Sequence, residues 1–184
     1  MAKEQLTDDI YSANVIEFVT VARAYCDFLE TPETHSRHDF VEKIRKLLPL
    51  IYLKSSLLPD TEPPNAAVID RWATEVEYNI IQERIRAVLG GRDDYLEVFD
   101  AGMQYCEEPI TASISENLSD IWQDLKDFLM NYRSDSPDIM LAALGLCKSN
   151  FETFWGQRLV NCLRAVHNLA FNTLNEFHTE EGDY

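Results

Sequence analysis

Apolar side chains recur every three or four residues through most of this 184-residue chain, and this spacing constrains the fold most strongly. Between residues 9 and 29, for example, Phe18, Ala22, Cys26 and Leu29 fall on one side of a helix with 3.6 residues per turn. A strand would instead place alternate residues on one face. The spacing therefore predicts amphipathic α-helices, each of which buries one face.

Six segments carry this helical pattern, and they are residues 9–29, 36–57, 68–89, 113–132, 137–148 and 149–177. Gly90-Gly91 predicts the end of the third helix, and Pro137 occupies the first position of the fifth. A single helix over 137–177 would be about 60 Å long, whereas a globule of this size has a radius of gyration near 16 Å. We therefore expect a break near Lys148.

These segments predict an all-α fold, a single-domain bundle of about six helices over residues 1–184. Residues 59–66 predict a proline-rich linker loop, and residues 179–184 predict a flexible acidic tail. Residues 92–112 lack the helical period. Because 95–99 is β-prone and 103–110 is long enough to pair with it, this insertion is either irregular or one small β-hairpin between helices three and four.

The charge balance excludes two classes of partner. With 16 Lys+Arg against 32 Asp+Glu, the formal net charge is −16. Such a chain repels DNA phosphate and anionic lipid, so we expect no nucleic-acid or membrane partner. The four cysteines form no C-x-x-C pair, the first residues form no apolar leader, and no stretch of 18 apolar residues exists. These features predict a cytoplasmic protein.

The motifs that mark common chemistries are missing. The six glycines are scattered apart from Gly90-Gly91, and neither G-x-S-x-G nor H-E-x-x-H occurs. We therefore predict no cofactor and no metal, and the residues leave open whether the protein is an enzyme. One acidic face stands out, on the fourth predicted helix, and it carries Glu116, Asp120, Asp124 and Asp127. It is either a solvated polar face or, closed by another helix, a site for a hard cation.

The last predicted helix carries the candidate site. Its polar positions hold amides and arginines rather than Glu and Lys, which favours a groove or a subunit interface. His167 lies among apolar residues and is either a hydrogen-bonded core residue or a ligand-binding group. Tryptophans 72, 122 and 155 are predicted to anchor the core. The candidate ligand or interface residues are Trp155, Arg158, Asn161, Arg164 and His167; catalytic residues are unknown.

Three stretches point to a family. They are residues 93–100 (DDYLEVFD), 115–126 (SENLSDIWQDLK) and 151–167, which begins FETFWGQR and ends LRAVH. Together they resemble an uncharacterised bacterial, largely helical family catalogued as a domain of unknown function, over roughly residues 10–169. The resemblance implies a mainly helical cytosolic protein with no assigned activity. Family members often carry a histidine before the Trp-Gly pair; Phe154 stands there, so the resemblance implies no imidazole chemistry at that position.

Three functions are consistent with these observations. The first is a non-catalytic interaction protein, whose partner, or a second copy of the chain, docks on an exposed helix face. The second is an enzyme or small-ligand binder with a pocket on the C-terminal helix. The third is an acidic mimic of DNA that binds a basic protein.

Overall fold

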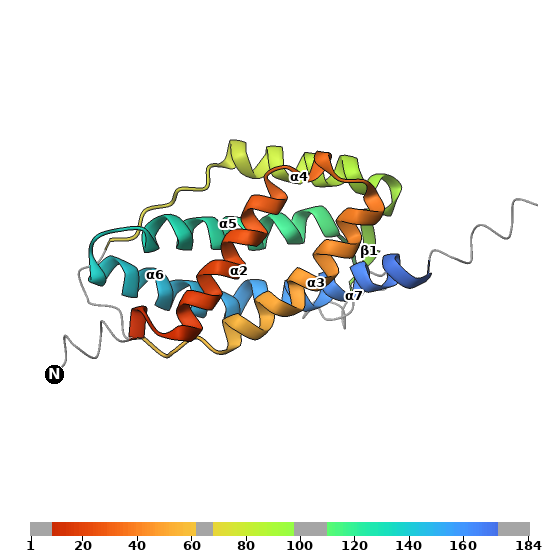
Figure 1. Ribbon diagram of the computed structural model, residues 1–184. Helices are drawn as coiled ribbons and strands as arrows, with labels where there is room; N and C mark the ends of the chain where they lie inside the picture. Colours follow the sequence, from red (N-terminus) through yellow and green to blue (C-terminus); the bar gives the residue numbers. More distant parts are fainter. Residues whose placement is uncertain (1–8, 62–67, 98–109, 173–184) are drawn as a thin grey trace, which may run out of the picture.

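A computed structural model describes residues 9–61, 68–97 and 110–172, and they form a mostly helical bundle with one small antiparallel hairpin (Figure 1). The predicted fold class is confirmed. The elements are α2 (Ala13–Leu29), η1 (Pro32–Thr34), α3 (Arg37–Ser56), α4 (Glu75–Leu89), η2 (Gly90–Arg92), β1 (Asp94–Leu96), β2 (Thr111–Ser113), α5 (Ile114–Tyr132), α6 (Pro137–Asn150), the π-helical turn η4 (Phe151–Trp155) and α7 (Gly156–Asn172).

Helix α5 is the central element of the bundle. It packs against α2, α4, α6 and α7, while α3 packs against α2 and α7 (Figure 1). Trp122 of α5 and Trp155 of η4 are almost completely buried, as the sequence predicts. The hydroxyl of Tyr25 donates a hydrogen bond to the carbonyl oxygen of Leu118 over 2.8 Å, which ties α2 to α5 inside the core. The prediction for Trp72 is wrong, because 47% of this residue is exposed.

Helix α4 begins at Glu75, later than residue 68, where the sequence predicts its start. Its first turn is fixed by a capping box: Thr74 Oγ1 accepts the Glu77 N–H over 3.2 Å, and the Glu77 carboxylate accepts the Thr74 N–H over 3.0 Å. The buried residues are Ile81, Ile85 and Leu89. Val76, which has the apolar spacing of the predicted helix 68–89, is 68% exposed. The helix ends at Gly90, whose φ of 59° suits glycine.

The predicted break near Lys148 is wrong. Helix α6, the turn η4 and helix α7 follow one another without an interruption, and the backbone remains right-handed helical at Phe151 and Gly156. The core residues 147, 151, 155 and 159 succeed each other by four. In a helix of 3.6 residues per turn, each such step drifts by about 40°. A π-helical turn holds more residues, so it absorbs the drift and keeps these side chains facing the core.

The hairpin is present, but its second strand lies later than expected. β1 pairs antiparallel with β2, with Asp94 opposite Ser113 and Leu96 opposite Thr111. The expected partner segment 103–110 falls outside the described residues except for position 110, as do residues 62–67 of the proline-rich stretch and the tail 179–184. The hairpin places Asp93 beside the first turn of α5. This carboxylate is 4% exposed and accepts the Ser115 N–H over 2.8 Å and the Ser115 hydroxyl over 2.6 Å.

Candidate functional site

A cleft of about 340 Å³ lies between the segment before α4, helix α5 and helix α6. Its volume is within the range of sites for small molecules. The cleft combines apolar side chains with carboxylates, amides and one guanidinium. Its lining residues are Ile69, Asp70, Arg71, Gln123, Asp124, Asp127, Phe128, Ala143, Leu146, Cys147, Asn150 and Phe154.

Asp124 is a partly buried carboxylate of this cleft, and its pKa is raised. Asn150 Nδ2 donates a hydrogen bond to Asp124 Oδ1 over 2.6 Å, while Oδ2 accepts no hydrogen bond from the described residues. Burial raises the pKa of Asp124 most strongly, and the Asn150 hydrogen bond and the Arg71 charge oppose this rise. The carboxylate therefore retains an unused acceptor in a partly desolvated position, which is a favourable arrangement for binding a donor or a cation.

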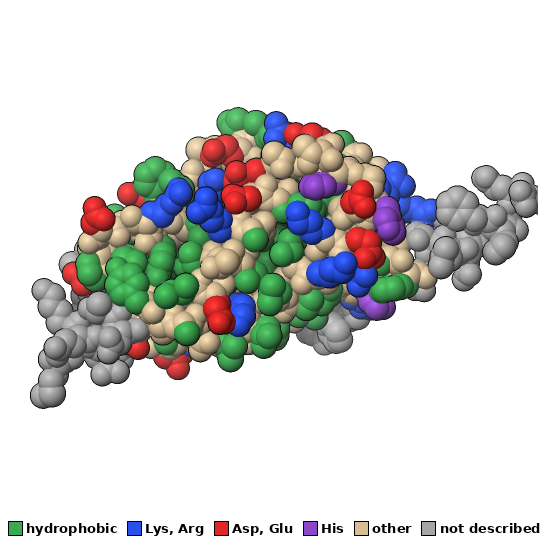
Figure 2. Space-filling model, in the orientation of Figure 1, with side chains coloured by type: hydrophobic (Ala, Val, Ile, Leu, Met, Phe, Trp, Pro, Cys, Tyr) green, Lys and Arg blue, Asp and Glu red, His purple; other side chains and the backbone are tan. Residues whose placement is uncertain are grey.

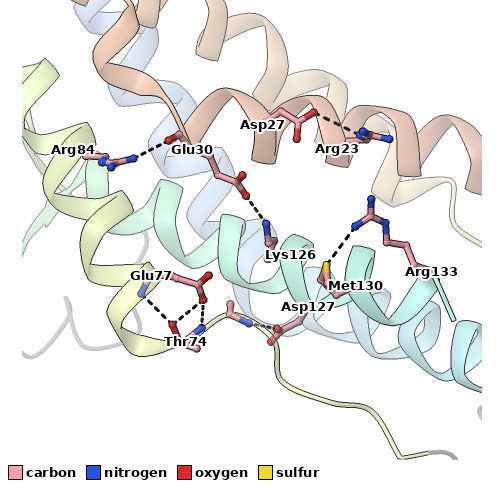
Figure 3. A network of polar contacts seen from close by, with 11 residues as sticks. Arg23, Asp27, Glu30, Thr74, Glu77, Arg84, Lys126, Asp127, Met130 and Arg133 are labelled. Atoms are coloured by element: carbon pink, nitrogen blue, oxygen red, sulfur yellow. Dashed lines mark hydrogen bonds and ion pairs between the residues drawn. The ribbon is translucent and has the colours of Figure 1, made fainter.

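Asp127, one turn further along α5, builds one wall of the cleft. Its Oδ1 accepts hydrogen bonds from the backbone N–H groups of Trp72 and Ala73, over 2.6 and 2.8 Å. Figure 3 shows this side chain pointing from α5 to the chain just before Thr74. Asn131 adds a second clamp, because it exchanges hydrogen bonds with the backbone N–H and C=O of Asp70. The side chains of α5 therefore hold the segment before α4 in place.

The electrostatics of the cleft favour a positively charged occupant. Three carboxylates and one guanidinium line it, a formal charge of −2. Cys147 also lines the cleft and is 3% exposed. Burial, with a smaller contribution from the Asp124 charge, raises the pKa of this thiol well above its ordinary value. Because the thiolate is the nucleophilic form, Cys147 is not poised as a nucleophile at neutral pH.

None of the five residues predicted on the C-terminal helix lines this cleft. Trp155 lies in the core. Arg158 forms an ion pair with Asp120 of α5 over 2.9 Å, and its guanidinium stacks 4.6 Å from the Phe154 ring. Asn161 is 6% exposed, and its Nδ2 donates to Glu97 Oε1 over 2.5 Å. Arg158 and Asn161 thus join α7 to α5 and to the residue after β1.

Arg164 and His167 lie on the outer side of α7. Both are exposed, so the prediction of a buried His167 is wrong. The imidazole instead contacts the ring of Phe171, with centroids 4.7 Å apart. His167 and Phe171 lie four residues apart on α7, so their rings meet on the helix surface without being buried in the core. The structure therefore divides the five predicted residues among the core, an interhelical seam and the surface, and their proposed role stays a prediction.

Three of the four carboxylates on the acidic face of α5 are engaged by neighbouring groups, whereas Glu116 is exposed. Asp120 accepts a hydrogen bond from the Tyr78 hydroxyl over 2.9 Å in addition to its ion pair, and Asp124 and Asp127 are engaged as described above. Within residues 9–61, 68–97 and 110–172, no three His, Cys, Asp or Glu side chains are grouped as metal ligands. In the same part of the chain, no helix has the length and apolar character needed to cross a membrane.

These features define a class of protein, a mostly helical single domain with an acidic, small-molecule-sized cleft beside its central helix. The chain belongs to the family described as "Domain of unknown function (DUF5063)", whose model matches residues 9–172. This confirms the resemblance inferred from the sequence. Among solved structures, it is similar to the crystal structure of protein BF1032 from Bacteroides fragilis, with a TM-score of 0.79 and 38% identity over 88% of this chain and 95% of that chain. The comparison with curated proteins found no match.

Sequence reasoning identified the acidic positions of the cleft but not the cleft itself. Asp124 and Asp127 are singled out by their spacing on one helix face. Asn150, Arg71 and Phe154 are not, because they come from segments on either side of α5 in the sequence, and no local pattern shows that they meet. One local pattern does mark the edge of the cleft. Thr74 and Glu77 form a capping box, which indicates that a helix begins there and that residues 68–73 before it are not helical.

Proposed function

We propose that this protein binds a small organic cation, a primary amine or a guanidinium on a short aliphatic arm, in the cleft between α5 and α6. The observation that carries this proposal is the half-satisfied Asp124 carboxylate at a cleft of about 340 Å³. A charged donor adds a charge-assisted hydrogen bond to the free oxygen and offsets the unfavourable burial of the carboxylate. An anion would be repelled by the same group.

The apolar lining accounts for the aliphatic arm. Leu146 is 47% exposed and Phe154 is 43% exposed, and both line the cleft. A short chain of methylene groups laid against them buries apolar surface on both partners. We propose binding without chemical conversion for this site, where the thiol of Cys147 is buried.

The experiment compares three ligands that share a short unbranched carbon chain and differ in charge. Butylamine carries a positive charge, butanamide is neutral and butyrate is negative. We expect only butylamine to bind by titration calorimetry and to raise the Tm. At a ligand concentration of about 100 Kd, binding stabilises the fold by about 2.7 kcal/mol, which corresponds to about 5–10 °C for a domain of this size.

Two variants with the same change of charge locate the site. Asp124→Asn should abolish the response to butylamine, because the amide keeps the shape but loses the charge. Asp135→Asn, on the exposed loop after α5, should bind butylamine as the unchanged protein does. Equal binding of butylamine and butanamide, or an unchanged response in Asp124→Asn, would exclude the proposal.

A further inference from the structure

Helix α4 carries two apolar faces, and only one of them is covered by residues 9–61, 68–97 and 110–172. Ile81, Ile85 and Leu89 pack inward. The opposite side exposes Val76 and Ile80, 68% and 44% accessible, together with Ala87. We call these three residues the outer stripe of α4. The helix lies along the outer edge of the bundle, with α5 as its main helical neighbour (Figure 1).

The side chains beside the outer stripe are negatively charged near the start of α4 and positively charged near its end. The N-terminal half of α4 carries Glu75 and Glu77, and the C-terminal half carries Arg84 and Arg86. Seven residues separate Glu77 from Arg84, about two turns, so the two side chains share one flank of the stripe. Eleven residues, about three turns, separate Glu75 from Arg86, which share the other flank. Each flank is therefore acidic at one end and basic at the other.

We propose that α4 pairs antiparallel with α4 of a second copy of this chain, through the outer stripe. In such a pair, a twofold axis places each flank against the same flank of the partner. Glu77 then meets Arg84 of the second copy, and Glu75 meets Arg86 of the second copy. Both pairings require the twofold axis at the same place, between Ile80 and Ile81, so one register satisfies them together. A parallel pair would instead set like charges side by side.

The pairing has to add to contacts that these side chains already make: Glu77 caps Thr74, Arg84 lies 3.7 Å from the Glu33 carboxylate, and Arg86 lies 3.5 Å from that of Asp93. Arg84 donates through one nitrogen to the Glu30 carbonyl over 3.0 Å, and a guanidinium carries five N–H donors. Glu83 lies within the stripe and is paired with Arg86 over 2.8 Å. In the antiparallel register it lies near Asn79 of the second copy, whose amide is able to donate to it.

Another exposed apolar region lacks this complementarity. Leu50, Leu53 and Leu57 recur on the outer side of α3, and Figure 2 shows hydrophobic side chains over α2 and α3 with charges of both signs around them. Helix α4 has 15 residues, about 22 Å, so its contact is smaller than the roughly 800 Å² per partner of a stable complex. We therefore expect a reversible, concentration-dependent dimer.

Sedimentation velocity between 5 and 500 µM tests the association. The mass should rise from 21.2 kDa toward twice that value, and the rise should weaken in 1 M NaCl because the flanking pairs are screened. Ile80→Asn should keep the protein monomeric. Leu53→Asn on α3, where the residue is 52% exposed, is the matched control and should dimerise normally.

Cysteine cross-linking tests the orientation, in a chain with Cys106→Ser. Cys26, Cys147 and Cys162 are buried and should not react. Ile80→Cys lies next to the twofold axis and should form an intermolecular disulfide on mild oxidation. Val76→Cys should not, because the two residues lie about 13 Å apart along the axis, beyond the roughly 7 Å that a disulfide spans between Cα atoms.

Three results would overturn this inference. The first is a monomer at all concentrations, as expected if another segment of the same chain covers the stripe. The second is loss of the dimer in Leu53→Asn but not in Ile80→Asn, which would place the interface on α3. The third is cross-linking at residue 76 as efficient as at residue 80, which would contradict the antiparallel register.

Discussion

Replacing Gly156 with alanine should destabilise this protein, although the same change stabilises an ordinary helix. Inside a regular α-helix, alanine is favoured over glycine by about 1 kcal/mol. Gly156 closes the π-helical turn, and its N–H donates to the Phe151 carbonyl oxygen. A Cβ added at Gly156 would lie 2.3 Å from that oxygen and 3.0 Å from Cδ2 of the Phe151 ring. The first contact is with backbone, which cannot rotate away.

The magnitude follows from the two ways in which the helix can respond. Keeping the turn compresses a packed site, which is typically unfavourable by about 1–3 kcal/mol. Opening the turn loses a hydrogen bond worth about 1 kcal/mol and moves Trp155, which is completely buried. After the gain of about 1 kcal/mol in helix propensity is subtracted, keeping the turn leaves a net loss of up to about 2 kcal/mol, which lowers the Tm by up to about 4–8 °C.

Urea denaturation followed by far-ultraviolet circular dichroism measures this loss. Gly91→Ala is the matched control, because a Cβ there would meet nothing within 4 Å. It should change the free energy of unfolding by less than about 0.5 kcal/mol. If Gly156→Ala were as stable as the unchanged protein, the argument that the π-helical turn requires glycine would be refuted.

Three further predictions concern single side chains. Thr74→Ala removes the N-cap of α4 and should lower the free energy of unfolding by about 1–2 kcal/mol in urea titrations, whereas an unchanged midpoint would contradict the capping role. Asp93→Ala leaves the buried N–H and hydroxyl of Ser115 without their acceptor and should lower it by about 2–4 kcal/mol; a smaller loss than for Thr74→Ala would argue against this anchor. Because burial raises the pKa of Asp124 above its ordinary 3.8, the stability that this group contributes is complete at low pH and is lost as the pH rises through the raised pKa. Asp124→Asn should therefore be more stable than the unchanged protein at pH 7.5 and equal to it near pH 3, as measured by chemical denaturation at both values, and a difference independent of pH would contradict the assignment.

Much of the fold can be predicted from the sequence because helix formation depends on residues that are close to one another in the chain. The N-cap serines and the glycine at the end of α4 act on backbone groups within four residues of themselves. The apolar period likewise predicts Trp122 and Trp155 in the core, since each lies in a stripe with one clear apolar face.

The errors occur where two apolar faces compete or where a helix leaves its ideal period. In α4, Val76 and Ile80 form a stripe as plausible as that of Ile81 and Ile85, and only the packing against α5 decides which faces inward. The length of a single helix over 137–177 predicts a break near Lys148. The structure instead widens one turn, which keeps both halves packed on the same core.

The sequence by itself determined the helical class, most helix ends and the acidic face of α5, because these depend on residues a few positions apart. Only the tertiary structure decided that Asp124 meets Asn150 beside a cleft, that His167 is exposed, and that the outer stripe of α4 is uncovered. The physical reason is that burial and pKa depend on which segments come together. The residues that line the cleft lie up to 85 positions apart in the sequence, from Ile69 to Phe154, and no local pattern encodes their meeting.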